Sequence, residues 1–456
     1  MSLLLLVPGL ISLILVVRGR IETAFLNVYL PCLLLLPQDY LFRIPHLPAF
    51  SVADYALIPL GVVGLSRLIR SGSFALMDVL VVLYTASIGL SEILHAPVLN
   101  DGIFSAIVAF VTIFLAYTTG RRLIEPDLRF ATIRRFVIFV LLDAAPGMYE
   151  WKMGQSLYGL VGNRVLGIST IVESVQMRNG HGRMSSVFNG SEPGGIAFAM
   201  AFCLNAWLAY LRRVKARVDL GKTLATLEKY HLSELILIAS VWFTQARGPL
   251  IALAASYLIL QIPRFKKTRL MTCIVAILLV GGYLETKAYF ASYANVADYA
   301  VSSEQQGSAQ YRIIMNQVYA PIAEAGGWTG WGVLEIPHVQ GKDSIDNHYL
   351  LVHLAWGRLG YIFFILIVWE NIRVLLVRSW QFEAAQDRAF VFSMMAAMAV
   401  LWFTLLTVFM GGQLPQISFL LIGWIQSMVP GVAATSSGAQ ITENLNRKFS
   451  FRQVFT

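Results

Sequence analysis

Three short polar stretches hold the residues of this chain whose types and spacing could do chemistry. Arg183 and Glu192 lie in the first, which ends in a proline and two glycines, and Arg247 lies in the second, a tight Arg-Gly-Pro turn. Arg312 and the segment 346–349 form the third. A guanidinium held by a tight backbone suits bidentate binding of phosphate. The three stretches are therefore candidates for a functional site, and Arg247 in its tight turn is a candidate for binding phosphate.

Three side chains in these stretches are candidates for accepting a proton. Glu192, Asp346 and His348 each lie beside the start of an apolar segment, and a carboxylate or imidazole there can act as a general base. A structural role competes with each assignment. Glu192 can favour a helix start electrostatically, Asp346 or Asn347 can cap a helix, and a lone histidine is more often structural. The residue types leave both interpretations open.

Amide and aromatic side chains near the third stretch could bind sugar. Asn347, Tyr349 and Trp331 offer the hydrogen bonds and stacking surfaces that an acceptor glycan needs. Tyr349, Trp331 and Trp328 equally fit the aromatic belt found at membrane interfaces. External arginines can extend to lipid headgroups in the same way. Binding to headgroups explains Arg247 less well, because Arg247 lies in a very short turn that can hold its side chain in place.

The elements that must position these residues are membrane helices. The chain has 456 residues, of which 57% are hydrophobic and 13% charged, whereas soluble domains carry about 25% charge. Its mean hydropathy is +0.65. Continuous apolar runs recur along the whole length, each long enough to cross about 30 Å of hydrocarbon as a helix. We therefore expect an all-α, polytopic integral membrane protein.

The apolar runs predict about twelve to thirteen transmembrane helices. The large external loop lies between the helix ending near 288 and the helix starting near 349. The expected spans are 2–17, 21–36, 50–66, 74–94, 102–119, 132–150, 194–211, 231–244, 247–263, 270–288, 349–372, 389–410 and 414–432.

The distribution of basic residues predicts the orientation. Most Lys and Arg residues fall in alternate loops, and the richer side of a membrane protein faces the cytoplasm. Loops 151–193 and 289–348 are then external, or periplasmic in a cell with two membranes. Residues 1–433 form one transmembrane domain, and the Ser/Thr/Asn-rich segment 434–456 is a cytoplasmic tail.

Composition also excludes several function classes. The net charge of +9 is distributed over short loops between helices, so it indicates membrane orientation and not a nucleic-acid partner. The three cysteines lie inside apolar runs, and no Cys/His cluster has the spacing of a metal site. We therefore expect neither a metal nor a cofactor.

Taken in order, these motifs resemble the O-antigen ligase and polymerase superfamily over roughly residues 160–425. The shared pieces surround one large external loop, and their order and spacing carry the resemblance. They are Arg-x-x-Ser-x-Phe at 183–188 followed by Glu192-Pro193, Thr-x-x-Arg-Gly at 244–248, Ser-Ala-Gln-Tyr-Arg at 308–312, Gly-x-Gly at 330–332, and Asn347-x-Tyr349-Leu350 followed by Gly357-x-x-Gly360.

This resemblance implies a metal-independent glycosyltransferase of the GT-C type in the bacterial inner membrane. Such enzymes take a glycan from an undecaprenyl diphosphate carrier at the outer, periplasmic face. Arg183 and Arg247 match the family arginines that hold the diphosphate, and Arg312 is a third match. The expected partners are the lipid-linked oligosaccharide donor, a glycan acceptor and the lipid bilayer. A chain-length regulator is a further partner that the sequence leaves open.

One departure from the family pattern bears on the reaction. Ligases, which pass the glycan to lipid A core, carry His-Asn-x-Tyr/Phe-Leu at the end of the large loop, whereas this chain has Asp346 at the histidine position and an out-of-phase His348. The resemblance therefore favours a polysaccharide polymerase, which passes the glycan to another lipid-linked repeat unit. An O-antigen ligase is the alternative, and a flippase of lipid-linked glycan is a second alternative. The flippase is disfavoured because the arginines gather at one face and no internal repeat is visible.

Overall fold

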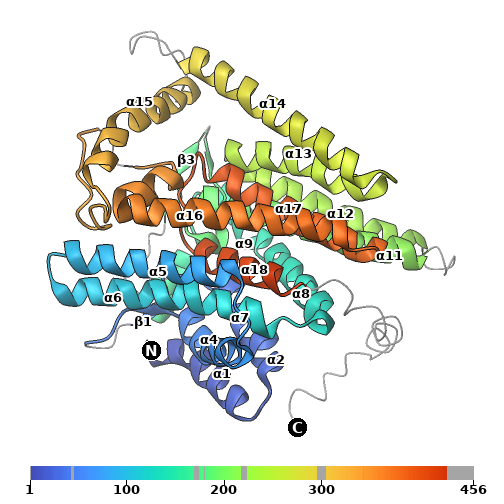
Figure 1. The fold of residues 1–456 in the computed structure, drawn as a ribbon, viewed down its shortest axis with the longest axis horizontal. Coiled ribbons are helices and arrows are strands. Elements are labelled where there is room, and N and C mark those ends of the chain that lie inside the picture. The colour runs from blue at the N-terminus through green and yellow to red at the C-terminus, as the bar shows by residue number, and fades with distance from the viewer. Residues whose placement is uncertain are drawn as a thin grey trace.

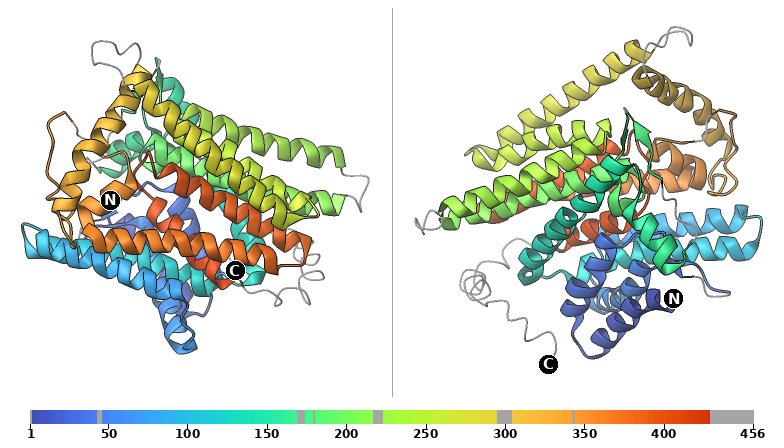
Figure 2. Two further views of the ribbon diagram at one scale, coloured as in Figure 1. Left: turned by 45° about the horizontal axis from the view of Figure 1, so that its top comes forward. Right: turned by 180° about the vertical axis from the view of Figure 1, so that it is seen from behind.

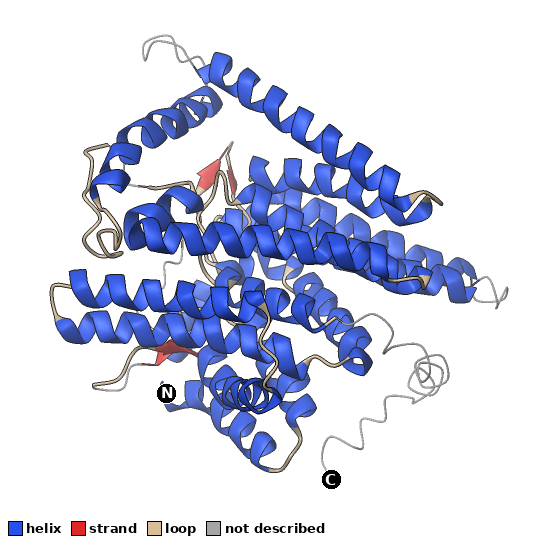
Figure 3. Cartoon of the chain, viewed as in Figure 1, coloured by secondary structure: helices blue, strands red, loops and turns tan. Residues whose placement is uncertain are grey.

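The structure is a computed structural model and describes residues 2–42, 46–168, 174–178, 180–216, 223–294, 304–341 and 344–428. The predicted cytoplasmic tail, 434–456, lies outside the described residues. Helices joined by loops make up the described chain, apart from two small antiparallel sheets (Figure 3). In the first sheet β1 (Leu41–Phe42) pairs with β2 (Phe50–Ser51), and in the second β3 (Met177–Arg178) pairs with β4 (His181–Gly182).

Each of the thirteen predicted spans overlaps helical structure among the described residues. The helices in order are α1 (Val7–Val17), α2 (Ile21–Ala24), α3 (Leu30–Leu35), α4 (Val52–Ser71), α5 (Leu76–His95), α6 (Leu99–Ala109), α7 (Ala116–Leu123), α8 (Arg129–Leu142), α9 (Ala144–Met153), α10 (Leu157–Val161), α11 (Ser191–Ala216), α12 (Thr223–Phe243), α13 (Arg247–Gln261), α14 (Thr268–Ala294), α15 (Glu304–Ala325), α16 (His348–Gln381), α17 (Ala385–Thr404) and α18 (Leu414–Ser427).

The all-α membrane architecture is confirmed. Within the described residues, seven helices are long and apolar enough to cross a membrane; these are α4, α5, the continuous run Leu99–Leu123, α11, α14, α16 and α17. Other predicted spans correspond to shorter apolar helices, such as Leu3–Val17, or to a helix interrupted at Asp143, between α8 and α9.

Helix α11 lies at the centre of the bundle, and α14 lies at its edge (Figures 1 and 2). The first half of α11 is rich in small residues, including Gly194 and Gly195, so α12, α13 and α17 can pack closely against it. In its most apolar window 83% of the α11 residues are buried, against 11% for α14. The bundle is therefore built around α11, while α14 exposes most of its surface.

Segment 289–348, which the sequence predicts to be external, is more helical than expected. Helix α14 continues past residue 289 to Ala294, and α15 occupies much of the remainder as a 22-residue helix. Met315, Tyr319 and Ala323 recur every four residues, so they share one face of α15 and pack on Leu354 of α16. Burial of this face explains why a polar sequence folds as a helix here. The described irregular part of the segment is confined to 326–341 and 344–347.

Helix α16 is broken near its start, where the segment 326–332 crosses it. Gly357 has a φ of +64°, and the backbone on both sides of it bonds to the crossing segment. Trp331 N–H donates to the Leu354 carbonyl (2.9 Å), and Arg358 N–H donates to the Gly327 carbonyl (3.0 Å). A Cβ on Gly330 or on Gly357 would collide with the other backbone. The two glycines therefore permit a contact that joins the external segment to α16.

Candidate functional site

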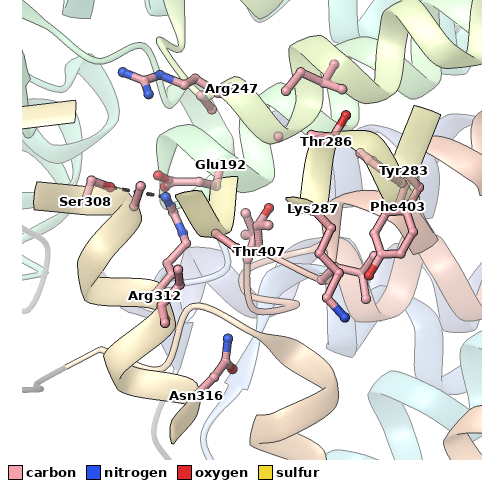
Figure 4. A pocket seen from close by; sticks show the side chains of 18 of the residues that line it. Glu192, Arg247, Tyr283, Thr286, Lys287, Ser308, Arg312, Asn316, Phe403 and Thr407 are labelled. Carbon is pink, nitrogen blue, oxygen red and sulfur yellow. Dashed lines mark hydrogen bonds between the residues drawn. The ribbon is translucent and has the colours of Figure 1, made fainter. Parts of the chain in front are cut away.

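One cavity of about 460 Å³ gathers side chains from the regions that the sequence singled out. It lies between the starts of α11 and α13, the ends of α14 and α17, and α15 (Figure 4). Five basic residues and one carboxylate line it. They are Arg178, Arg183, Arg247, Lys287, Arg312 and Glu192. The lining cations outnumber the lining carboxylate, so a multivalent anion is the ligand that this cavity suits electrostatically.

The rest of the cavity wall is largely apolar. Ile251 of α13, Tyr283 of α14, Ile313 of α15 and Phe403 of α17 all contribute to it. Tyr283 and Phe403 stand together on the side opposite Arg312 in Figure 4. A cavity that combines clustered cations with an apolar wall fits a ligand with an anionic head and a hydrocarbon chain.

Arg183 is the most firmly held of the five cations. It is 3% exposed, and its Nη2 lies 2.6 Å from Glu192 Oε1. Its Nη1 donates to Gln176 Oε1 (2.5 Å), and its Nε donates to the Thr244 carbonyl (3.2 Å). These three acceptors come from different segments, so Arg183 joins the loop before α11, the helix start itself and the α12–α13 turn. Its guanidinium is fixed before any ligand arrives.

Arg247 and Lys287 carry charges that no described residue neutralises in an ion pair. Arg247 is the first residue of α13 and follows a turn in which Gln245 adopts a φ of +52°. Lys287 lies near the end of α14. Both side chains are exposed, and neither forms an ion pair with any residue that the structure describes. Their charges are therefore available to a ligand.

Arg312 is held more loosely from α15. Its Nη1 donates to Ser308 Oγ at 3.2 Å (dashed in Figure 4), and its Nη2 lies 3.8 Å from Asp346 Oδ2. Asn316, one turn further along α15, also lines the cavity and accepts a hydrogen bond from Asn347 Nδ2 (3.1 Å). Asp346 and Asn347 thus contact the two α15 side chains, Arg312 and Asn316, that line the cavity.

The three candidate bases are placed very differently. Glu192 lines the cavity itself. Asp346 reaches it only through Arg312, and its other oxygen accepts from Ser344 Oγ. His348 is 5% exposed, packs its ring against Phe364, and accepts a hydrogen bond from the Met410 backbone N–H (3.3 Å). Of these three residues, Glu192 alone touches the space where a substrate would lie.

The candidate sugar-binding residues have structural partners in this structure. Asn347 caps α16 by accepting from the Leu350 N–H (3.2 Å), so one of the two capping alternatives is observed. The Tyr349 hydroxyl donates to the Trp402 carbonyl (3.1 Å), and Trp331 Nε1 donates to the Ile322 carbonyl (2.9 Å). None of the three is among the residues that line the cavity.

Comparisons with known protein families and with curated proteins find no match for this chain. The chemistry of the cavity therefore has to be argued from its own residues. Their most distinctive property is that cations from separate segments of the chain meet in one space with an apolar wall.

Two of the five cations, Arg178 and Lys287, were not predicted as site residues. Arg178 is in β3 and donates from Nη1 to the Gln245 carbonyl (3.0 Å), beside the turn that carries Arg247. Lys287 ends a predicted span. The sequence did offer one signal: both belong to the smaller set of basic residues, which the charge distribution predicts to be external.

Proposed function

We propose that this protein is a bacterial surface-polysaccharide polymerase. In this proposal it transfers an oligosaccharide from undecaprenyl diphosphate to a second lipid-linked repeat unit, at the outer face of the inner membrane. The observation that carries the proposal is the cavity in which five cations face an apolar wall. The resemblance of the sequence motifs to the polymerase and ligase superfamily supplies the identity of the lipid and of the transferred group.

The diphosphate would occupy the cationic side of the cavity. Arg247 and Lys287 form no ion pair with a described residue, so their charges can bind a phosphate. Arg312 can move toward a phosphate because its contact with Asp346 is long, at 3.8 Å. The prenyl chain would lie along the apolar wall formed by α13, α14 and α17. Preorganised cations in a site of low dielectric constant stabilise developing negative charge strongly, which is the contribution that a bound metal makes in other transferases.

The reaction then needs one proton acceptor near the anomeric carbon. The acceptor hydroxyl oxygen forms a bond to that carbon, and the bond from the carbon to the phosphate oxygen breaks with its electrons leaving on the diphosphate. The hydroxyl proton passes to Glu192, which lies at the cavity wall. Attack from the side opposite the leaving group inverts the anomeric configuration. Asp346 acts in this scheme by positioning Arg312.

Reconstitution tests the proposal directly. The purified protein in liposomes would receive a synthetic undecaprenyl diphosphate oligosaccharide in the presence of EDTA, and the products would be separated by electrophoresis and identified by mass spectrometry. A ladder of lipid-linked glycans of increasing length is the expected result. Transfer that occurs only after lipid A core is added would identify a ligase. Movement of the lipid between leaflets without transfer would refute an enzymatic role.

A further inference from the structure

A second cavity lies on the other side of the Arg183–Glu192 ion pair. Its volume is about 430 Å³, within the range of about 300–1,000 Å³ that is usual for small-molecule sites. Its wall is made mainly of hydroxyl, amide and carboxylate side chains, in contrast to the apolar wall of the cationic cavity. Examples from separate segments are Asp39, Tyr158, Ser174, Gln176 and Asn189.

The two cavities share a wall. Arg183 and Glu192 line both of them, so a ligand in either space reaches the same ion pair. Gln176, which accepts a hydrogen bond from Arg183, faces the polar cavity. A molecule bound in the polar cavity is thus close to Glu192, which also lines the cavity proposed for the diphosphate. Two substrates of one transfer reaction must be held next to each other in this way.

Asp39 and Asn189 both line the polar cavity. They come from distant parts of the sequence and meet through a hydrogen bond from Asn189 Nδ2 to Asp39 Oδ1 (3.1 Å). Asn189 has a left-handed backbone, with a φ of +51°, and Asp39 follows α3. Burial raises the pKa of the Asp39 carboxyl, because its charged form is poorly solvated. Donors from a ligand would restore that lost solvation.

We propose that the polar cavity binds the acceptor glycan, with Asp39 and Asn189 holding sugar hydroxyls and directing the reactive hydroxyl toward Glu192. This inference rests on the proposed function, because it names the second substrate of the same transfer. The carboxylate of Asp39 accepts hydrogen bonds, and the amide of Asn189 both donates and accepts them. Neighbouring sugar hydroxyls need both kinds of partner, because each hydroxyl is a donor and an acceptor. Asp39 and Asn189 act here as specificity-determining residues.

The first experiment separates the two cavities by ligand. The full-length protein in lipid nanodiscs would be titrated with two probes: farnesyl diphosphate, and a lipid-free oligosaccharide released from the host's own surface polysaccharide. Asp39→Asn and Asn189→Gly are the test variants, the latter because glycine keeps the left-handed backbone. Arg247→Ala is the variant for the diphosphate cavity. Asp101→Asn, an exposed aspartate at the start of α6, is the matched control.

The expected result is a reciprocal pattern. Asp39→Asn and Asn189→Gly each weaken oligosaccharide binding by about tenfold or more, as loss of a hydrogen bond to a charged or amide group does, and leave farnesyl diphosphate binding within twofold. Arg247→Ala does the reverse, and the Asp101 variant changes neither. In transfer assays the KM for a soluble acceptor rises in both test variants, while kcat and the KM for the lipid-linked donor stay near the parent values.

Two outcomes would overturn the assignment and leave the proposed function standing, and a third would overturn both. If the parent protein binds farnesyl diphosphate but the test variants bind oligosaccharide as well as the parent does, the polar cavity is not the acceptor site. If their donor KM rises in place of the acceptor KM, the cavity holds the donor sugar. If the parent binds neither probe and transfers no glycan, the proposed function fails together with this inference.

Discussion

Arg183 and Arg247 line the same cavity but have opposite surroundings. Arg183 is buried among three protein acceptors, whereas Arg247 is exposed and has no ion pair with any described residue. A buried, fully bonded arginine contributes to folding as well as to function, while an exposed, unpaired one contributes little to stability. Replacing the two arginines should therefore have different consequences for the folded protein.

Replacing Arg247 by alanine should abolish most activity and spare the fold. We expect transfer to fall about 100-fold to 1,000-fold, the range seen when one preorganised electrostatic contact to a transition state is lost. The thermal unfolding temperature should change little. Arg264→Ala, an exposed arginine after α13, is the matched control. Polymer of full length from the Arg247 variant would show that Arg247 does not hold the diphosphate.

Substitution of Glu192 should separate catalysis from stability. Glu192→Ala leaves the buried Arg183 guanidinium without its carboxylate, so we expect the free energy of unfolding to fall by about 3 kcal/mol. This is the lower end of the range for a broken buried ion pair, because Gln176 and Thr244 still accept hydrogen bonds from Arg183. Glu192→Gln keeps an acceptor for Arg183 but is a poor base. That variant should unfold near the parent temperature and bind farnesyl diphosphate normally, yet lose transfer. Normal kcat in Glu192→Gln would exclude Glu192 as the base.

At the residue scale, the sequence predicted the cations better than the base. Arg183, Arg247 and Arg312 were expected to share a site, and the structure brings them to one cavity. Asp346 and His348 were expected to share it too, but these residues, two positions apart at a helix start, point in different directions. Asp346 faces Arg312, whereas His348 turns inward onto Phe364. That direction depends on packing between α16 and its neighbours, which a single sequence does not reveal.

The crossing of segment 326–332 over α16 depends on two glycines. A methyl group at Gly330 would collide with the backbone of Gly357 and Ala355, and Gly330 has a φ of +77°. Gly327 has a similar φ of +65° but open space around it. Gly327→Ala should therefore show only the backbone strain, about 1–2 kcal/mol. Gly330→Ala adds the collision, so its unfolding temperature should fall further. Equal losses in the two variants would show that the contact contributes nothing.

An exposed ion pair joins α15 to α16 and adds a small, pH-dependent contribution to stability. Arg358 Nη2 donates to Glu324 Oε2 (2.7 Å), and this hydrogen bond lowers the pKa of Glu324. A carboxyl whose pKa is lower in the folded state adds stability above its unfolded pKa. That stability is lost as the pH falls through the folded pKa. Carbon-13 NMR titration of the glutamate carboxyls should show the Glu324 pKa rising in Arg358→Gln and staying constant in Arg264→Gln.

At the element scale, apolar runs predicted where the helices lie because membrane spans are defined by local composition. Helix α15 was not predicted, because its apolar residues are sparse. They form a buried face only where α15 packs on α16, and the sequence does not show that contact. The motif glycines at 330 and 357 were noticed in the sequence, but their partnership follows from a tertiary contact between segments that are 27 positions apart.

The charge distribution predicts which end of the whole molecule faces outward. Glu335 lies in the external segment, and Lys266 lies in the turn between α13 and α14 at the opposite end of the bundle; both are exposed. In a Cys273→Ala background, a membrane-impermeant maleimide should label Glu335→Cys in intact spheroplasts. It should label Lys266→Cys only after lysis. The reverse pattern would invert the assigned orientation.

The exposure of α14 makes the lipid bilayer a part of the cavity wall. Tyr283, Thr286, Lys287 and Ala291 all contribute to the cavity from this one helix, yet its apolar window is only 11% buried against the rest of the protein. The part of α14 that does not pack on the protein is left to be covered by acyl chains. The position of Lys287 is then sensitive to the thickness and order of the bilayer. The geometry of the cavity should therefore differ between detergent micelles and bilayers of different acyl-chain length.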